Sequence, residues 1–176
     1  MGCFANFFRY IYAFLALIAI FIMILILTLP TYWSYCGDTK CNLQFYMNPS
    51  HAFCIHNSNF LCPPEYRTSN THRVIWIIYI LIIPIILVCA ILNFVTALLC
   101  CPFGPKGVTT ATGLSAFLCF ICIFMSMLSF GTKKVSYVGI TNRPGPTAYI
   151  AIIEFILLVS MTVLSSFVSF LSKLCL

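Results

Sequence analysis

Residues 10–30 read YIYAFLALIAIFIMILILTLP, and this stretch decides the fold because it contains no charged side chain. About 20 apolar residues let a helix cross the hydrocarbon core of a bilayer. The run lacks the A-x-A-like exit of a cleaved signal peptide, so we expect it to remain as a membrane span. The chain of 176 residues is 62% hydrophobic and 7% charged, whereas soluble domains carry about 25% charged residues. The sequence therefore predicts an integral protein of a lipid bilayer.

Three further apolar runs follow, at residues 74–99, 111–131 and 148–171. Inside lipid each run must be helical, because every backbone amide needs a partner within its own segment. We therefore expect an all-α membrane protein, a four-transmembrane-helix bundle that forms one domain over residues 1–176. An even number of spans places both ends of the chain on one side of the membrane. The three connections cover residues 31–73, 100–110 and 132–147.

Aromatic residues occur near the ends of the predicted spans, where amphipathic rings favour the membrane–water interface. They are Tyr10, Tyr12, Trp33, Trp76, Tyr79 and Tyr149. We expect them to form an interfacial belt, in which Trp33 anchors the chain where it leaves the first helix.

Two signals conflict over which side of the membrane holds the first connection. The side of the termini carries three basic residues, Arg9, Lys106 and Lys173. The other side carries six, Lys40, Arg67, Arg73, Lys133, Lys134 and Arg143. Because cytosolic loops are enriched in Lys and Arg, this count places the first connection in the cytosol.

Cysteine usage indicates the opposite orientation. The first connection holds Cys36, Cys41, Cys54 and Cys62. An even number of cysteines in a polar segment fits two disulfides in an oxidising compartment. Cysteines on the other side all lie within a few residues of a span end, where cytosolic thiols are palmitoylated. These lipidation candidates are Cys3, Cys100, Cys101 and Cys175.

A cytosolic zinc site is the competing explanation for the cysteines of the first connection. Zinc knuckles favour closely paired cysteines, and only Cys36 and Cys41 approach that spacing. His51, His56 and His72 fit no ligand template. We therefore expect extracellular disulfides, no metal and no cofactor. The predicted location is the plasma membrane, with both termini in the cytosol.

Two polar residues interrupt the apolar spans. Glu154 lies six residues into the fourth span, about 9 Å deep at 1.5 Å per residue. A carboxyl group there is costly, so we expect it to face the bundle, protonated or bonded to Tyr79 or Ser126. A functional role and a structural role both remain open. Asn93 in the second span is expected to hydrogen-bond between helices.

Small residues form a stripe on the third span, including the C-x-x-C sequence of Cys119 and Cys122. Its members are spaced by 4, 3, 4 and 3 positions: Ser115, Cys119, Cys122, Ser126 and Ser129. Such a stripe lets membrane helices approach closely. We therefore predict a packing role rather than redox or metal chemistry.

Enzymes and nucleic-acid-binding proteins are disfavoured by the remaining residues. No nucleophile–base pair, paired carboxylates or phosphate-binding glycine loop is present in the sequence. The basic residues are dispersed between the apolar runs, unlike a nucleic-acid footprint. We expect neither an enzyme nor a nucleic-acid partner.

Several segments resemble the claudin superfamily, which includes peripheral myelin and epithelial membrane proteins. Residues 29–33, LPTYW, are similar to the Leu-Pro-x-Trp segment after the first claudin helix. Cys54 and Cys62 resemble the claudin loop pair, and Arg73 lies where claudins carry an arginine at the start of the second helix. Residues 113–129 have the Gly- and Ser-containing composition of a claudin third helix.

The resemblance implies a small disulfide-linked β-sheet in the first connection, on the extracellular side. Residues 42–47 begin with alternating polar and apolar positions, which suits one short strand. Claudin spacing implies a Cys54–Cys62 disulfide and leaves Cys36 and Cys41 as an additional local pair. His-Ala-Phe precedes Cys54 where claudins have Gly-Leu-Trp.

A function in cell–cell contact or adhesion is the main implication of the resemblance, including that of a junction barrier or pore. Partners would be other membrane proteins, among them a second copy of the chain in the same or a neighbouring cell. An accessory subunit of an ion channel or receptor, and a surface protein of a specialised contact such as that between gametes, remain as alternatives.

Overall fold

Four long helices dominate the computed structural model, which describes residues 2–29, 33–36, 44–47, 52–55, 70–99, 106–131 and 141–174. The helices are α1 (Gly2–Thr28), α2 (Asn70–Leu98), α3 (Lys106–Gly131) and α4 (Pro146–Leu174). Each contains a segment long and apolar enough to cross a membrane: Ala5–Thr28, Arg73–Leu98, Lys106–Leu128 and Pro146–Leu171. The prediction of four helices, each long and apolar enough to span a membrane, is confirmed.

All four helices begin earlier than the predicted spans, and the difference is largest for α1 and α3. The α1 helix starts at Gly2 rather than near residue 10, and therefore includes Arg9. The α3 helix starts at Lys106 rather than at residue 111. Its first turns contain Thr110 and Thr112, whose hydroxyls donate to carbonyls of the same helix. Polar side chains satisfied in this way are compatible with a membrane helix, which a search for purely apolar runs does not allow for.

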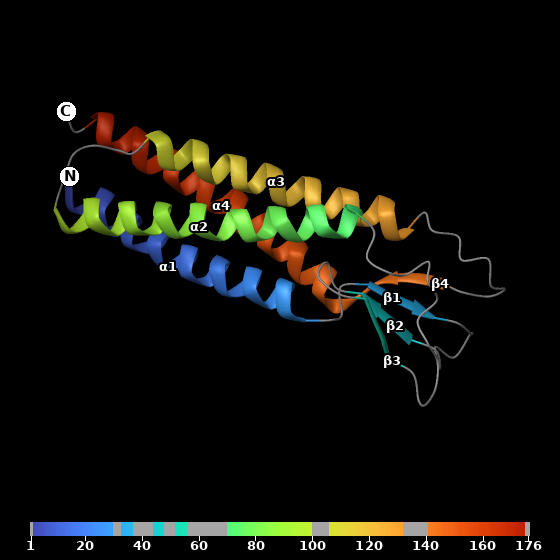
Figure 1. Cartoon of the computed structure of the whole chain (residues 1–176). Coiled ribbons are helices and arrows are strands. Elements are labelled where there is room, and N and C mark those ends of the chain that lie inside the picture. The colour runs from blue at the N-terminus through green and yellow to red at the C-terminus, as the bar shows by residue number, and fades with distance from the viewer. Residues whose placement is uncertain are drawn as a thin grey trace.

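The helices pack side by side as a bundle (Figure 1). The α1 helix contacts α2 and α4, and α3 contacts the same two helices. Ala16 and Ala19 on α1 are fully buried, and such small side chains let neighbouring helices approach closely. The rest of the core is aliphatic, with Met23, Ile82 and Leu158 among its fully buried side chains.

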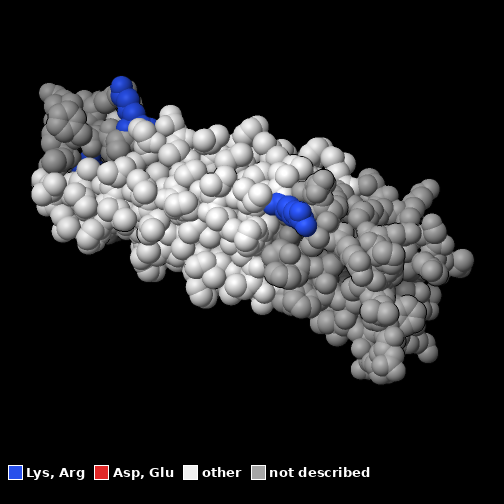
Figure 2. Space-filling model, in the orientation of Figure 1, with Lys and Arg blue, Asp and Glu red and all other residues white. Residues whose placement is uncertain are grey.

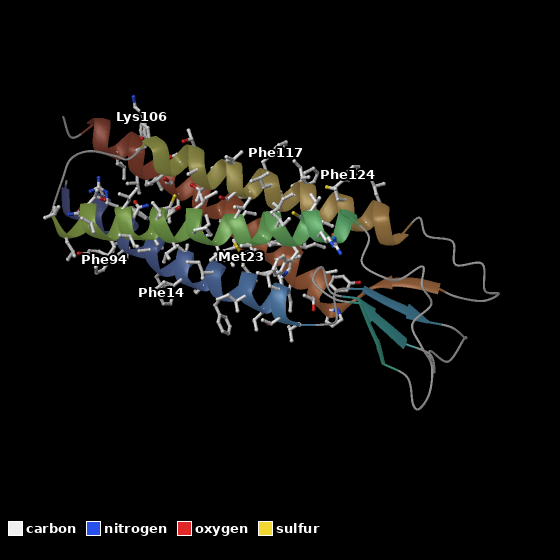
Figure 3. All side chains as sticks on the ribbon, in the orientation of Figure 1. Phe14, Met23, Phe94, Lys106, Phe117 and Phe124 are labelled. Atoms are coloured by element: carbon white, nitrogen blue, oxygen red, sulfur yellow. The ribbon has the colours of Figure 1, made fainter. Side chains whose placement is uncertain are left out.

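The outside of the bundle is apolar. Phe14, Phe94, Phe117 and Phe124 are exposed, and their side chains project away from the ribbons (Figure 3). On the face shown in Figure 2, basic side chains lie near the ends of the described helices and uncharged residues cover the length between them. A soluble bundle would have a wet polar surface here, so this exterior fits a lipid bilayer.

Short strands form a sheet beyond the end of the bundle. They are β1 (Trp33–Cys36), β2 (Gln44–Met47), β3 (Ala52–Ile55) and β4 (Thr141–Pro144). All pairings are antiparallel, in the order β3-β2-β1-β4. The sheet lies at the opposite end of the bundle from the start of α1 and the end of α4 (Figure 1).

The β4 strand comes from the connection between α3 and α4, so two connections that are distant in sequence share one sheet. Its residues TNRP have no apolar alternation, and the sequence predicted no strand there. Because β4 is an edge strand, Pro144 at its end needs no donor toward a second neighbour. The β4 strand leads almost directly into α4, and α4 contacts both β1 and β4.

Candidate functional site

Polar side chains buried inside the bundle form the candidate site. They are Arg9, Asn93, Thr112, Ser115, Ser126, Thr147, Glu154 and Ser165, accompanied by Tyr12 and Tyr79. Polar groups inside a membrane are costly and mark functional positions by default. We call them the interior polar residues. They are divided between the half of the bundle near the sheet and the half near the start of α1.

Glu154 on α4 is fully buried, as expected for a carboxyl group that avoids lipid. It lies eight residues after Pro146, about 12 Å along the helix at 1.5 Å per residue. Among the described residues, neither carboxyl oxygen of Glu154 has a hydrogen-bond partner. The expected bonds to Tyr79 and Ser126 are therefore not formed. An unsatisfied buried polar group is rare in a folded protein and calls for an explanation.

The surroundings of Glu154 are a thiol and a phenol. The Cys119 thiol on α3 lies close to the Glu154 carboxyl group, and the Tyr79 hydroxyl on α2 lies beside the same thiol. The Cys119 sulfur is also 4.0 Å from the Ala151 carbonyl oxygen on α4. Three helices thus contribute to one small polar cluster, Tyr79–Cys119–Glu154.

The small-residue stripe of α3 faces the interior of the bundle. Ser115, Cys119, Cys122 and Ser126 are buried, and the side chain of Ser129 lies outside the described residues. Cys119 and Cys122 are free thiols. Cys122 lies 4.0 Å from the Ile75 carbonyl oxygen on α2, and Ser126 donates to the Cys122 carbonyl. The stripe therefore lies against α2 on one side and α4 on the other, which suits close packing.

Arg9 is an interior residue that the sequence analysis treated only as a flanking charge. Its side chain is buried and donates to the Thr96 carbonyl oxygen at 3.1 Å and to Asn6 Oδ1 at 3.3 Å. Thr96 belongs to the last turn of α2, where carbonyl oxygens lack helical partners and a cation is favoured. The apolar and aromatic residues around Arg9, in FFRYIY, are the sequence signal that could have identified it.

Tyr12 and Tyr79 were expected in the interfacial belt, and the structure corrects this expectation. Both are fully buried, whereas Tyr10, Trp76 and Tyr149 are exposed. The Tyr12 hydroxyl lies beside the Cys89 thiol of α2 and the Thr112 hydroxyl of α3. Distance from a span end does not specify which face of a helix a residue occupies. Tyr12 and Tyr79 lie on the faces that point into the bundle, and they are therefore buried.

Two further polar contacts lie in the half of the bundle near the start of α1. Asn93 donates to the Cys89 carbonyl oxygen at 3.1 Å, a bond within α2 rather than the interhelical bond expected. The hydroxyls of Thr109 and Ser165 are 2.9 Å apart and link α3 to α4. The interhelical hydroxyl pair was missed because single Thr and Ser residues are common in such helices.

Residues predicted at the sheet lie on two of its strands, β1 and β3, and on α2. Trp33 and Cys36 are the first and last residues of β1, Cys54 is in β3, and Arg73 is exposed in the first turn of α2. The side chains of the strand residues lie outside the described part. Also outside it are Cys41, Cys62, Cys100, Cys101, Cys175 and the side chain of Cys3.

The strand register limits how the four cysteines could pair. Cys36 lies opposite Gln44, and Cys54 lies opposite Phe45 on the other side of β2. Two strand spacings of about 4.8 Å therefore separate the backbones of Cys36 and Cys54. A disulfide joins Cα atoms less than about 7 Å apart, so a Cys36–Cys54 bond does not fit this sheet.

The described residues contain no group of three His, Cys, Asp or Glu side chains arranged to hold a metal ion. Their polar interior holds two ionisable groups of opposite kind, the Arg9 guanidinium and the Glu154 carboxyl group, among hydroxyls, amides and thiols. Comparison of the chain with protein-family models and with curated proteins found no match.

Proposed function

We propose that the chain is a claudin-like integral membrane protein that mediates contact between cells at the plasma membrane. In this proposal the sheet is extracellular and both termini are cytosolic. The observation that carries it is the strand order β3-β2-β1-β4, in which β4 joins the two connections at one end of the bundle. A contact protein needs a defined surface beyond the lipid, and a sheet continuous with α4 can supply one.

Disulfides would stabilise this surface in the oxidising extracellular compartment. The strand register disfavours a Cys36–Cys54 bond, and the proposed pairs are Cys36–Cys41 and Cys54–Cys62. A short loop constrains the unfolded chain less than a longer one. We therefore expect Cys54→Ala to reduce surface expression more than Cys41→Ala. Mass spectrometry that finds Cys36 linked to Cys62 would contradict the pairing.

Orientation is tested first, with an epitope tag at residue 58 and another at the C-terminus. On intact cells an antibody should stain only the tag at residue 58. If that tag is stained only after permeabilisation, the sheet is cytosolic and the contact function is wrong.

Contact between cells is tested by mixing two cell populations that express differently tagged copies. Immunoprecipitation of one tag should recover the other from the mixed populations. Co-expression of both copies in one cell provides the control, because it reports association within a single membrane. Recovery only after co-expression, together with a channel or receptor subunit, would favour the accessory-subunit alternative.

The role of the sheet is tested by detaching β4. Neighbouring amides of an antiparallel edge strand alternate between facing the partner strand and facing away. Thr141→Pro and Asn142→Pro each remove one amide, so the variant that removes the donor toward β1 should reduce recovery between populations. Asn142→Ala keeps the amide and serves as the matched control. Unchanged recovery with both proline variants would remove the sheet from the contact surface.

A further inference from the structure

A groove lies between α3 and α4 at the end of the bundle away from the sheet. Its volume is about 320 Å³, and its lining consists of Lys106, Thr109, Thr110, Ser166, Ser169 and Phe170. Lys106 is the first residue of α3, and its side chain points away from the bundle (Figure 3). The groove thus combines one cation, four hydroxyl-bearing residues and one aromatic ring.

No described residue compensates the positive charge of the groove. Glu154 is the only acidic residue in the described part of the chain. It precedes Ser166 by twelve residues on α4, about 18 Å at 1.5 Å per residue. No carboxylate of the described residues therefore competes for Lys106. The backbone amides in the first turn of α3 add a positive partial charge at the same place, so an anion is favoured there.

Two of the four hydroxyl groups that line the groove are available to a ligand only as acceptors. The Thr110 hydroxyl donates to the Gly107 carbonyl oxygen at 3.0 Å, and the Ser166 hydroxyl donates to the Thr162 carbonyl oxygen at 2.8 Å. Because these hydrogens are already used, the oxygens can only accept bonds from a ligand. A suitable ligand therefore has an anionic part for Lys106 and a donor, such as an ammonium or hydroxyl group, for Thr110 and Ser166.

The level of the groove indicates that the ligand is a lipid. The membrane-spanning segments of α3 and α4 end at Lys106 and Leu171, and every lining residue lies within the last two turns before those ends. Phe170 is 58% exposed and gives the groove an apolar wall. A headgroup bound at this depth keeps its acyl chains in the bilayer, whereas a soluble anion would leave this ring exposed to water.

We propose that the α3–α4 groove binds the headgroup of an anionic phospholipid that also carries a hydrogen-bond donor. The phosphate lies against Lys106 and the first turn of α3, and the donor lies against Thr110 and Ser166. Basic pockets between membrane helices are known to hold lipid headgroups in this way. The inference is independent of the contact function, because it concerns the opposite end of the bundle.

Native mass spectrometry of the purified full chain, titrated with phosphatidylserine or phosphatidylcholine, tests the proposal. We expect phosphatidylserine to be retained in preference to phosphatidylcholine. Lys106→Gln should weaken phosphatidylserine binding about fivefold, the ratio that corresponds to the ~1 kcal/mol contributed by one basic residue near an anionic membrane surface. Lys106→Arg should bind as the parent chain does.

Two variants make the test specific. Arg73→Gln removes the same charge from an exposed position at the other end of the bundle and should leave binding unchanged. Ser166→Phe fills the groove from an exposed position without altering charge and should reduce retention at least as much as Lys106→Gln.

Three results would overturn the proposal. Equal retention of the two lipids would remove the preference for an anionic headgroup. Equal losses from Lys106→Gln and Arg73→Gln would indicate only a general attraction to charge. Full displacement of phosphatidylserine by soluble phosphoserine would identify a free phosphate compound as the ligand rather than a lipid.

Discussion

The two halves of the bundle treat a buried ionisable group in opposite ways. Near the start of α1, Arg9 is buried and donates to the Thr96 carbonyl of α2 and to Asn6. In the half nearer the sheet, Glu154 is equally buried, and neither of its oxygens has a hydrogen-bond partner among the described residues. Arg9 therefore has a structural explanation in the fold, whereas Glu154 has none.

This difference separates groups that hold the bundle together from groups that the fold merely tolerates. A buried polar group with hydrogen-bond partners contributes to stability. Its removal leaves the partner buried without a hydrogen bond, which costs free energy. An unsatisfied group costs free energy, and is expected to persist only when it serves another purpose. Substitutions of Arg9 and of Glu154 should consequently change stability in opposite directions.

The largest expected effect is from Arg9→Met, which keeps length and apolar contacts but removes the donors. Hydrogen bonds to charged groups contribute about 1.5–3 kcal/mol each, so we expect a loss of stability of about that size. Lower yield of monodisperse protein and a lower unfolding midpoint in detergent would show it. Asn6→Ala, which removes the weaker of the two partners at 3.3 Å, should cost less and provides the matched comparison.

An unchanged unfolding midpoint for Arg9→Met would contradict the comparison. The hydrogen bonds of Arg9 would then contribute no more to stability than the unpaired Glu154 carboxyl group does.

Glu154 is predicted to respond in the opposite sense. Replacing an unsatisfied buried group by an apolar one of similar size is neutral or stabilising, by up to about 1–3 kcal/mol. We therefore expect Glu154→Leu to fold at least as well as the parent chain. Glu154→Gln keeps the shape and polarity of the side chain, so its stability should lie between those of the parent chain and Glu154→Leu. The midpoint of unfolding in detergent measures both variants beside Arg9→Met.

Function completes the test of Glu154. If the carboxyl group is needed for function, Glu154→Leu should fold normally. Immunoprecipitation of one tagged copy should then no longer recover the other copy from the mixed cell populations. A clear loss of stability in Glu154→Leu would instead show that the carboxyl group bridges helices. That result would contradict the prediction drawn from its lack of hydrogen-bond partners among the described residues.

The spans and the inward position of Glu154 could be predicted because both follow from the cost of polarity in lipid. Arg9 was not predicted as an interior residue, since a search for uncharged runs ends at the first cation. Its burial depends on the Thr96 carbonyl, 87 positions away in the sequence.

The β4 strand was missed for a related reason. The residues TNRP carry no strand pattern of their own, and their conformation is supplied by pairing with β1. Tyr12 and Tyr79 show the same limit inside the bundle. The sequence shows that both lie near a span end, but it does not show which face of the helix they occupy. That face is the one toward Cys89, Thr112 and Cys119 on neighbouring helices. Partners that are distant in sequence decided each of these cases.

The smallest expected effect concerns the Thr109–Ser165 pair, which lies in the same half of the bundle as Arg9. Hydrogen bonds between membrane helices contribute about 0.6 kcal/mol on average, because the unfolded chain in lipid finds other partners. Thr109→Val and Ser165→Ala should each lower stability slightly, and a double-mutant cycle should return a coupling near that value. Ser160→Ala is the matched control, since its exposed hydroxyl bonds only to the Ile156 carbonyl of its own helix. Unfolding of all four proteins under one set of detergent conditions measures the coupling. A coupling of zero would mean that the 2.9 Å contact does not stabilise the bundle, and the contrast between its two halves would then rest on Arg9 alone.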